Sequence, residues 1–280
     1  MKKLFITLAI ALGCIPLTYS VANDPTCTLV NGAITDSATC RTQADKLTVK
    51  IYEIGLCNAQ PTAPTITDAA DLTSCQKIFS NTSGSQVTVT GTTSSGFLGT
   101  FTRPPNGTYT FGYMTLGPDH AVQASLTFAS AKTVTGGGSS GTHCWTKDGS
   151  MWRLDTSTSA FVECGNTVGN NLGMATSEYN SLDGSGGLFV NADSPTAGTN
   201  RYLTGEDLKL KLRPSSDTSY GDITKQLISV ALSPTITVSD TTANIDVGFM
   251  SSRSAKIKFD GAGNILFIKN GEIGMRLLAN

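Results

Sequence analysis

Two tryptophans lie close together in the stretch CWTKDGSMWR, residues 144–153, and their chemistry suits contact with a ligand. If Asp148 and Gly149 form a two-residue turn, Trp145 faces Trp152 across a short hairpin. Such an indole pair either stabilises the hairpin, by up to about 1 kcal/mol, or forms an aromatic surface that stacks on sugar rings or on a protein partner. Both interpretations remain open, and Trp145 and Trp152 are the predicted binding residues.

A second pattern that could carry out a reaction is GGSSG, residues 137–141, which matches the Gly-x-Ser-x-Gly motif of hydrolases. That motif requires a strand before the serine and a helix after it. Here it lies in a Gly- and Ser-rich tract with a strand expected beyond it, so we interpret Ser139 as a loop residue. His120 and His143 are the only histidines, and neither is placed by the sequence as a base for that serine. We predict that the protein is not an enzyme and name no catalytic residue.

Metal and cofactor sites lack a sequence signature. The chain has no Cys-x-x-Cys pair, and the acidic Gly loops DGSGG (183–187) and DGAGN (260–264) lack the ligand pattern of an EF-hand. The formal net charge of −1 provides no basic field for nucleic acid. We therefore predict no cofactor, no metal and no nucleic-acid partner.

The cysteines indicate disulfides in an oxidising compartment. Beyond Cys14 there are six, an even number that is typical of exported proteins. Because short loops close most readily, neighbours are expected to pair. The expected disulfides are Cys27–Cys40, Cys57–Cys75 and Cys144–Cys164. The third raises a geometric problem, because a strand at 161–164 placed beyond a 144–155 hairpin would lie too far from Cys144. Either that segment folds over the sheet face or this pairing is wrong.

The N-terminus predicts export. Two lysines precede a short apolar run, and small residues Ser20 and Ala22 mark a cleavage site, so residues 1–22 are identified as a bacterial signal peptide. Lipidation of Cys14 in the stretch ALGC is the alternative. No later apolar run is long enough to span a membrane. The expected location is the medium, the cell surface or the periplasm.

Short segments of alternating or β-branched residues, separated by Gly, Pro, Asn and Asp, predict an all-β fold, a Greek-key-type antiparallel sandwich. DGAGN and the dipeptide Asn270-Gly271 are hairpin signals. The expected strands are Lys46–Leu56, Ser85–Thr92, Gly107–Leu116, Ala121–Ser130, Asp207–Pro214, Gln226–Leu232, Thr235–Asp240, Asn244–Met250, Ala255–Asp260 and Asn264–Leu278.

Composition divides the chain into three regions after the signal peptide. Residues 23–133 form an N-terminal β-sandwich region, 134–199 a disulfide-closed, Gly- and Ser-rich insertion with the Trp hairpin, and 200–280 a C-terminal β region. Whether the first and last regions complete one sandwich or form two is left open.

One ribbon carries a family resemblance. In FTRPPNGTYTFGYMTL, residues 101–116, a Pro-Pro-Asn-Gly turn precedes a strand with Tyr109, Phe111 and Tyr113 on one face. A strand that begins Pro-Pro-x-Gly-Thr-Tyr-Thr resembles the penultimate strand of prealbumin-like sandwich modules of the Cna-B type, and KLTVKIYEI is similar to their first strand. The resemblance covers about residues 46–130. It implies a seven-strand Greek-key sandwich that serves as a stalk, adhesin or filament repeat.

Charged residues make up 15% of the chain, against about 25% in an average soluble protein. Together with the signal peptide, the disulfides and the ribbon, this neutral surface predicts a secreted bacterial cell-surface protein of structural or adhesive type. It is expected to be a filament or pilus-like subunit that assembles with itself or other surface proteins by strand addition. The expected donors are the segment 23–40 and the last strand, EIGMRLL. The alternative is a monomeric extracellular module that binds glycans or proteins, and a secreted hydrolase is the third interpretation.

Overall fold

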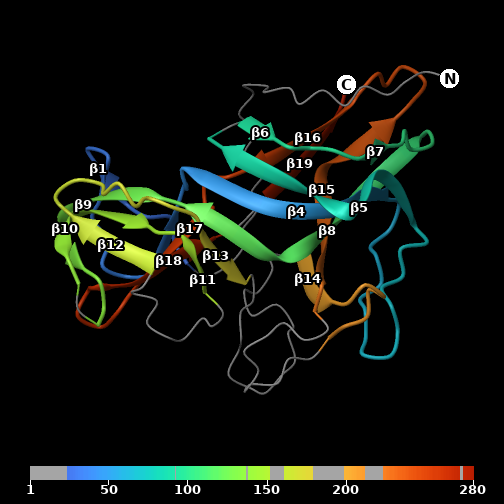
Figure 1. The fold of residues 1–280 in the computed structure, drawn as a ribbon. Coiled ribbons are helices and arrows are strands. Elements are labelled where there is room, and N and C mark those ends of the chain that lie inside the picture. Colours follow the sequence, from blue (N-terminus) through green and yellow to red (C-terminus); the bar gives the residue numbers. More distant parts are fainter. Residues whose placement is uncertain are drawn as a thin grey trace.

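The computed structural model describes residues 24–91, 93–136, 138–151, 161–178, 199–211, 223–271 and 274–280. Its sheets are mainly antiparallel, and the predicted all-β, sandwich-like class is confirmed (Figure 1). The strands are β1 (Leu29–Val30), β2 (Ala33–Ile34), β3 (Cys40–Thr42), β4 (Lys46–Cys57), β5 (Cys75–Thr90), β6 (Thr93–Ser95), β7 (Thr100–Phe101), β8 (Gly107–Gln123), β9 (Ser125–Thr133), β10 (Ser140–Thr146), β11 (Gly149–Met151), β12 (Val162–Gly165), β13 (Ala175–Glu178), β14 (Thr199–Thr204), β15 (Lys225–Val238), β16 (Ile245–Met250), β17 (Ala255–Phe259), β18 (Ile265–Asn270) and β19 (Gly274–Ala279).

The larger sheet is built around the long strands β4 and β8, which pair with each other over most of their length. Its order is β11-β13-β8-β4-β5-β6, and β15 joins the N-terminal half of β8. Leu47, Val49 and Ile51 alternate along β4 and are at most 1% exposed, as the period of two predicts. They belong to a first core that this sheet shares with the two-stranded sheet β16–β19.

The smaller part of the molecule contains a second core. A five-stranded sheet, in the order β1-β2-β9-β10-β12, shares this core with the three-stranded sheet β18-β17-β3. Phe128 on β9 and Phe259 on β17 meet edge to face, with their ring centroids 6.2 Å apart. Figure 1 shows these strands gathered at the left of the molecule, beyond the left-hand ends of β4 and β8.

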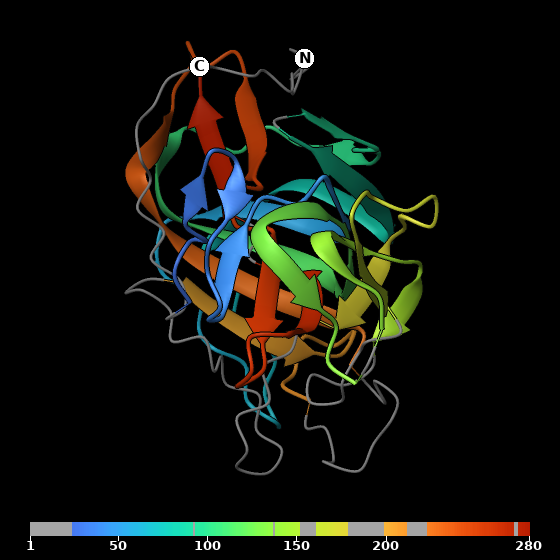
Figure 2. The same cartoon turned by 90° about the vertical axis from the view of Figure 1, so that its left-hand side faces the viewer.

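One long bent hairpin contributes to both cores. The chain passes from β16 in the first core to β17 in the second, turns at DGAGN, and returns through β18 to β19. At the bend, the Gly271 N–H donates to the Ser254 carbonyl, 2.7 Å away. Figure 2 shows these C-terminal strands, in orange and red, beside the blue N-terminal strands, and β3 pairs directly with β17. The hairpin 245–279 therefore braces the two cores against each other.

Most expected strands are present, and the errors have local causes. The segments 226–232 and 235–240 are one strand, β15, with an irregularity between Ala231 and Ile236. The expected strand at 207–214 is wrong in its described part, because Leu208 has φ of +54° and its N–H donates to the Gly205 carbonyl in a turn. The DGAGN hairpin is confirmed, whereas the one at Asn270-Gly271 is wrong, since β18 pairs with β17 and β19 with β16.

The aromatic ribbon differs from its expected arrangement in two respects. Tyr109 belongs to the first core, whereas Phe111 and Tyr113 pack in a smaller cluster with Cys57 and Leu227. The Pro-Pro-Asn-Gly segment connects β7 to β8, which do not pair with each other. The Tyr109 hydroxyl donates to the Pro105 carbonyl at 2.8 Å, and this hydrogen bond ties the turn to the strand that follows it.

Strands from the three predicted regions share sheets. From residues 134–199, β10 stands beside β9 and β12 beside β10, and from 200–280, β15 stands beside β8. The C-terminal strands thus complete the same cores as the N-terminal ones. All three expected disulfides are present: Cys27–Cys40, Cys57–Cys75 and Cys144–Cys164. The predicted signal peptide, Cys14, Trp152 and the DGSGG sequence lie outside the described residues.

Candidate interaction site at the β1 edge

Trp145, one of the two predicted binding residues, is buried. Only 3% of it is exposed, and its indole N–H donates to the Asn171 side-chain oxygen at 2.8 Å. The reason is topological, because β10 is an inner strand between β9 and β12, and the loop that follows β12 covers the ring. A Cβ atom added at Gly169 would lie 2.6 Å from the indole. Trp145 therefore offers no stacking surface, and the prediction of such a surface is wrong for this residue.

The expected Trp hairpin does not form between β10 and β11. β11 pairs instead with β13, in parallel, and the Asp148 carboxylate accepts a hydrogen bond of 2.7 Å from the Met174 N–H. β12 takes the place beside β10, where Cys144 stands directly opposite Cys164 with their Cα atoms 4.0 Å apart. This direct pairing removes the geometric problem that the sequence posed for the third disulfide.

The residues considered for catalysis or metal binding occupy separate structural positions. Ser139 is an exposed residue directly before β10, so a strand follows it and not the helix that a nucleophile elbow needs. His120 is 1% exposed on β8, and His143 lies on β10, where Nδ1 is 3.3 Å from the Thr142 hydroxyl. Within the described ranges there is no group of three or more potential metal ligands.

Exposed aliphatic side chains are a feature that the sequence pattern does not predict. In the described part of the chain the large hydrophobic side chains that remain exposed are Leu29, Val30, Ile66, Leu98 and Val168. Leu29 and Val30 lie inside the Cys27–Cys40 loop, Ile66 lies inside the Cys57–Cys75 loop, and Val168 follows Cys164 closely. Four of these five exposed aliphatic side chains therefore lie within or close to a disulfide-closed loop.

The pair on β1 has the most regular setting. Asn31 and Gly32 have φ of +52° and +79°, which identifies a two-residue turn of the type that matches strand twist. The turn joins β1 to β2, and the Thr35 N–H donates to the Thr28 carbonyl at 3.1 Å. The dipeptide Asn31-Gly32 between two aliphatic pairs is the sequence signal that would have identified this hairpin.

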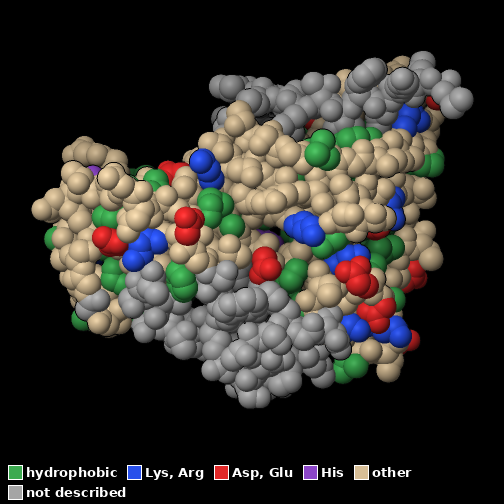
Figure 3. Space-filling view, viewed as in Figure 1, with side chains coloured by type: hydrophobic (Ala, Val, Ile, Leu, Met, Phe, Trp, Pro, Cys, Tyr) green, Lys and Arg blue, Asp and Glu red, His purple; other side chains and the backbone are tan. Residues whose placement is uncertain are grey.

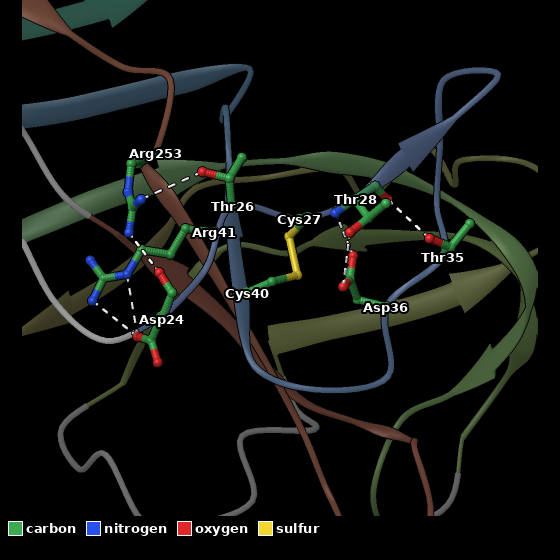
Figure 4. Close-up of a disulfide and its surroundings, with 9 residues drawn as sticks. All are labelled: Asp24, Thr26, Cys27, Thr28, Thr35, Asp36, Cys40, Arg41 and Arg253. Atoms are coloured by element: carbon green, nitrogen blue, oxygen red, sulfur yellow. Dashed lines mark hydrogen bonds and ion pairs between the residues drawn. A yellow bond between two sulfur atoms is a disulfide. The ribbon is translucent and has the colours of Figure 1, made fainter. Parts of the chain in front are cut away.

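The base of the hairpin is fixed by a disulfide and a carboxylate (Figure 4). Cys27–Cys40 ties the start of the hairpin to β3. The Asp36 carboxylate accepts hydrogen bonds from the N–H and the hydroxyl of Thr28, at 2.5 and 3.4 Å. These contacts fix the backbone at the base of β1.

An ionic cluster anchors the segment that leads into β1. Arg41, whose side chain is 2% exposed, donates to Asp24 from Nη2 at 3.0 Å and from Nε at 3.3 Å. Lys256 Nζ lies 2.6 Å from the same carboxylate, and Arg253 donates to the Asp24 carbonyl at 2.7 Å. Burial by itself would raise the pKa of Asp24, but the hydrogen bond and charge of Lys256, with those of Arg41, outweigh it and lower that pKa.

The edge of the larger sheet is shielded differently. Between β6 and β7, which both pair with β5, the chain leaves the edge in a loop from Gly96 to Gly99. Leu98 is 73% exposed there, and its carbonyl accepts a hydrogen bond from the Asn81 side chain at 2.7 Å. Such an interruption blocks strand addition. β1 carries no interruption, and its only partner in the described structure is β2.

Neither segment expected to donate a strand is a free arm, although β1, within 23–40, keeps an open edge. β19 pairs with β16 from Ile245 opposite Ala279 to Met250 opposite Gly274. The N-terminal segment is held by its disulfide and by Asp24, as described above. Among the described residues, no helix is long and apolar enough to cross a membrane. Comparison with models of known protein families, with curated proteins and with solved structures gave no match, so the resemblance to prealbumin-like modules stays a prediction.

Proposed function

We propose that this protein is a secreted bacterial cell-surface protein of structural or adhesive type, a subunit that assembles with copies of itself or with other surface proteins. Three disulfides support a location outside the reducing cytoplasm. The face in Figure 3 supports a structural role, because uncharged polar side chains and backbone cover most of it and charges are scattered.

The observation that carries the proposal is the β1 edge. A sheet edge is usually protected from pairing with other chains by charge, proline, a bulge or the shortness of its strand. β1 is short, with two residues, but has none of the other three protections. β1 instead exposes Leu29 by 56% and Val30 by 53%, on a hairpin that a disulfide and Asp36 hold in place. β1 lies within the N-terminal segment 23–40 that the sequence predicts for assembly. The proposed mode differs in that β1 stays folded in its hairpin and pairs through its open edge, and the last strand takes no part.

Immunogold electron microscopy of native cells tests this function, with a deletion strain as the control for antibody specificity. We expect label outside the cell envelope, on filaments or on a continuous layer, and recovery of the protein in a sheared surface fraction. Label confined to the cytoplasm, or protein found only as a free monomer in the medium, would contradict the proposal.

The alternative of a glycan-binding module loses its main support. It depended on an aromatic surface made by both tryptophans, and Trp145 is 3% exposed and hydrogen-bonded to Asn171. We therefore propose no second function.

A further inference from the structure

The backbone of Leu29 faces the open side of the sheet. In an antiparallel ladder the N–H and C=O of one residue point to the same neighbour, and successive residues point to opposite sides. The Thr28 carbonyl accepts from Thr35, so Thr28 points towards β2. Leu29 therefore presents its N–H and C=O outward, where an added strand would find them.

The side chain of Leu29 continues the apolar surface of the second core. Leu29 stands opposite Ile34 in the hairpin, and opposite residues of a ladder project from the same face. Ile34 is 2% exposed and belongs to the second core. A strand paired with β1 would cover Leu29 and extend this row of aliphatic groups by one position.

The surroundings of β1 fit a second copy of the same chain. The hairpin from Thr28 to Thr35 contains no charged residue, so two copies meet without repulsion between like charges. The nearest carboxylate, on Asp36, is occupied by the N–H and the hydroxyl of Thr28. Two identical antiparallel strands can be related by a two-fold axis. Their apolar faces then lie on the same side of the joined sheet only if one residue stands directly opposite the same residue of the other copy. Leu29 meets this condition and also points its backbone outward.

We propose that two copies of this chain pair antiparallel through β1, with Leu29 of one copy opposite Leu29 of the other. The pairing joins two five-stranded sheets into one and places the aliphatic row Ile34–Leu29 of each copy end to end. This inference rests on the proposed assembly function and names the partner and the residue at the centre of the contact. The contact is short, and interfaces below about 1,000 Å² are weak or transient. It is therefore a reversible joint that depends on protein concentration.

Disulfide trapping tests the register. In the proposed pair the Cα atoms of the two Leu29 residues are about 5.5 Å apart, within the roughly 7 Å limit of a disulfide. Leu29→Cys in the purified, exported protein should form a covalent dimer on mild oxidation. Val30→Cys is the matched control, because each Val30 lies opposite Thr28 of the other copy. The two Val30 residues are about 8 Å apart and project from the other face. Equal trapping of both variants, or trapping of Val30→Cys alone, would overturn the register.

Sedimentation velocity tests the association itself. The wild-type protein should pass from monomer to dimer as its concentration rises towards about 1 mM. Leu29→Lys should weaken dimerisation about tenfold or more, because two like charges then meet at the axis. Leu98→Lys places the same charge at another exposed leucine, on the interrupted edge, and should leave dimerisation unchanged. A wild type that stays monomeric, growth beyond dimers through β1, or equal effects of both lysines would each refute the proposal.

The proposed function and the proposed β1 contact can each be refuted without the other. Surface filaments on native cells, with a purified protein that neither dimerises nor traps at Leu29, would keep the proposed function and exclude this joint. Specific trapping at Leu29, with no surface label, would keep the joint and exclude the function.

Discussion

Asp24→Asn is the substitution that tests the ionic anchor most directly. It keeps the shape of the side chain and removes the charge that faces Arg41 and Lys256. Breaking a buried ion pair costs about 3–5 kcal/mol. The Asp24 side chain is 20% exposed, so water compensates part of that cost, and we expect a loss of about 2–3 kcal/mol in the free energy of unfolding at pH 7.

Urea unfolding with the disulfides intact measures this loss, and Glu206→Gln is the control. Glu206 pairs with Lys225 at 2.7 Å but is 65% exposed, and surface pairs contribute less than about 1 kcal/mol. Because the pKa of Asp24 is lowered by folding, its contribution is complete above the unfolded pKa of about 3.9 and is lost as the pH falls through the folded value. The difference between wild type and Asp24→Asn should therefore shrink in strong acid. A loss equal to that of the control, or one that does not change with pH, would refute the anchor.

Three further perturbations follow from the structure. Gly32→Ala, at φ of +79°, should lower stability in thermal melts by about 1 kcal/mol, whereas Gly107→Ala, which also meets open space but has no left-handed backbone, should not. Asn171→Ala removes the acceptor of the Trp145 indole and should cost about 1–3 kcal/mol, with a red shift of tryptophan emission; unchanged emission and stability would contradict that role. Replacing both cysteines of Cys57–Cys75, 18 residues apart, by alanine should cost about 3 kcal/mol in urea unfolding, and a change below 1 kcal/mol would show that the loop is constrained by other contacts.

The sequence predicts correctly those strands whose pattern of apolar residues matches the side of the strand that packs on a core. Leu47, Val49 and Ile51 alternate in the sequence and are buried in β4, because one face of that strand covers a core. The cysteine pairs were predictable from their spacing, since each closes a short loop. The alternating leucines of 207–212 carry the same signal as β4, yet Leu208 turns, because the Asp207 carboxylate accepts from the Lys209 N–H and the Leu208 carbonyl accepts from Ala70.

The site was harder to predict because it depends on neighbours distant in the sequence. Trp145 is buried by β9, β12 and the loop that follows β12, none of which the pattern around it reveals. β1 is two residues long, too short for any periodicity, and its position at an edge is set by the pairing of β2 with β9. An aliphatic pair looks the same in a sequence whether it enters a core or faces the solvent.

The hairpin 245–279 also determines when the chain can fold. Arg253 binds the Asp24 carbonyl across 229 residues, and Ser254 accepts the Ala44 N–H across 210. β3 pairs with β17, and residues of β16 and β19 form part of the first core. Neither core can therefore close until these C-terminal strands have been synthesised. Contacts this distant in sequence form slowly. The growing chain therefore has no complete domain to fold early. If the protein is exported as proposed, its folding and the closure of its disulfides would follow translocation.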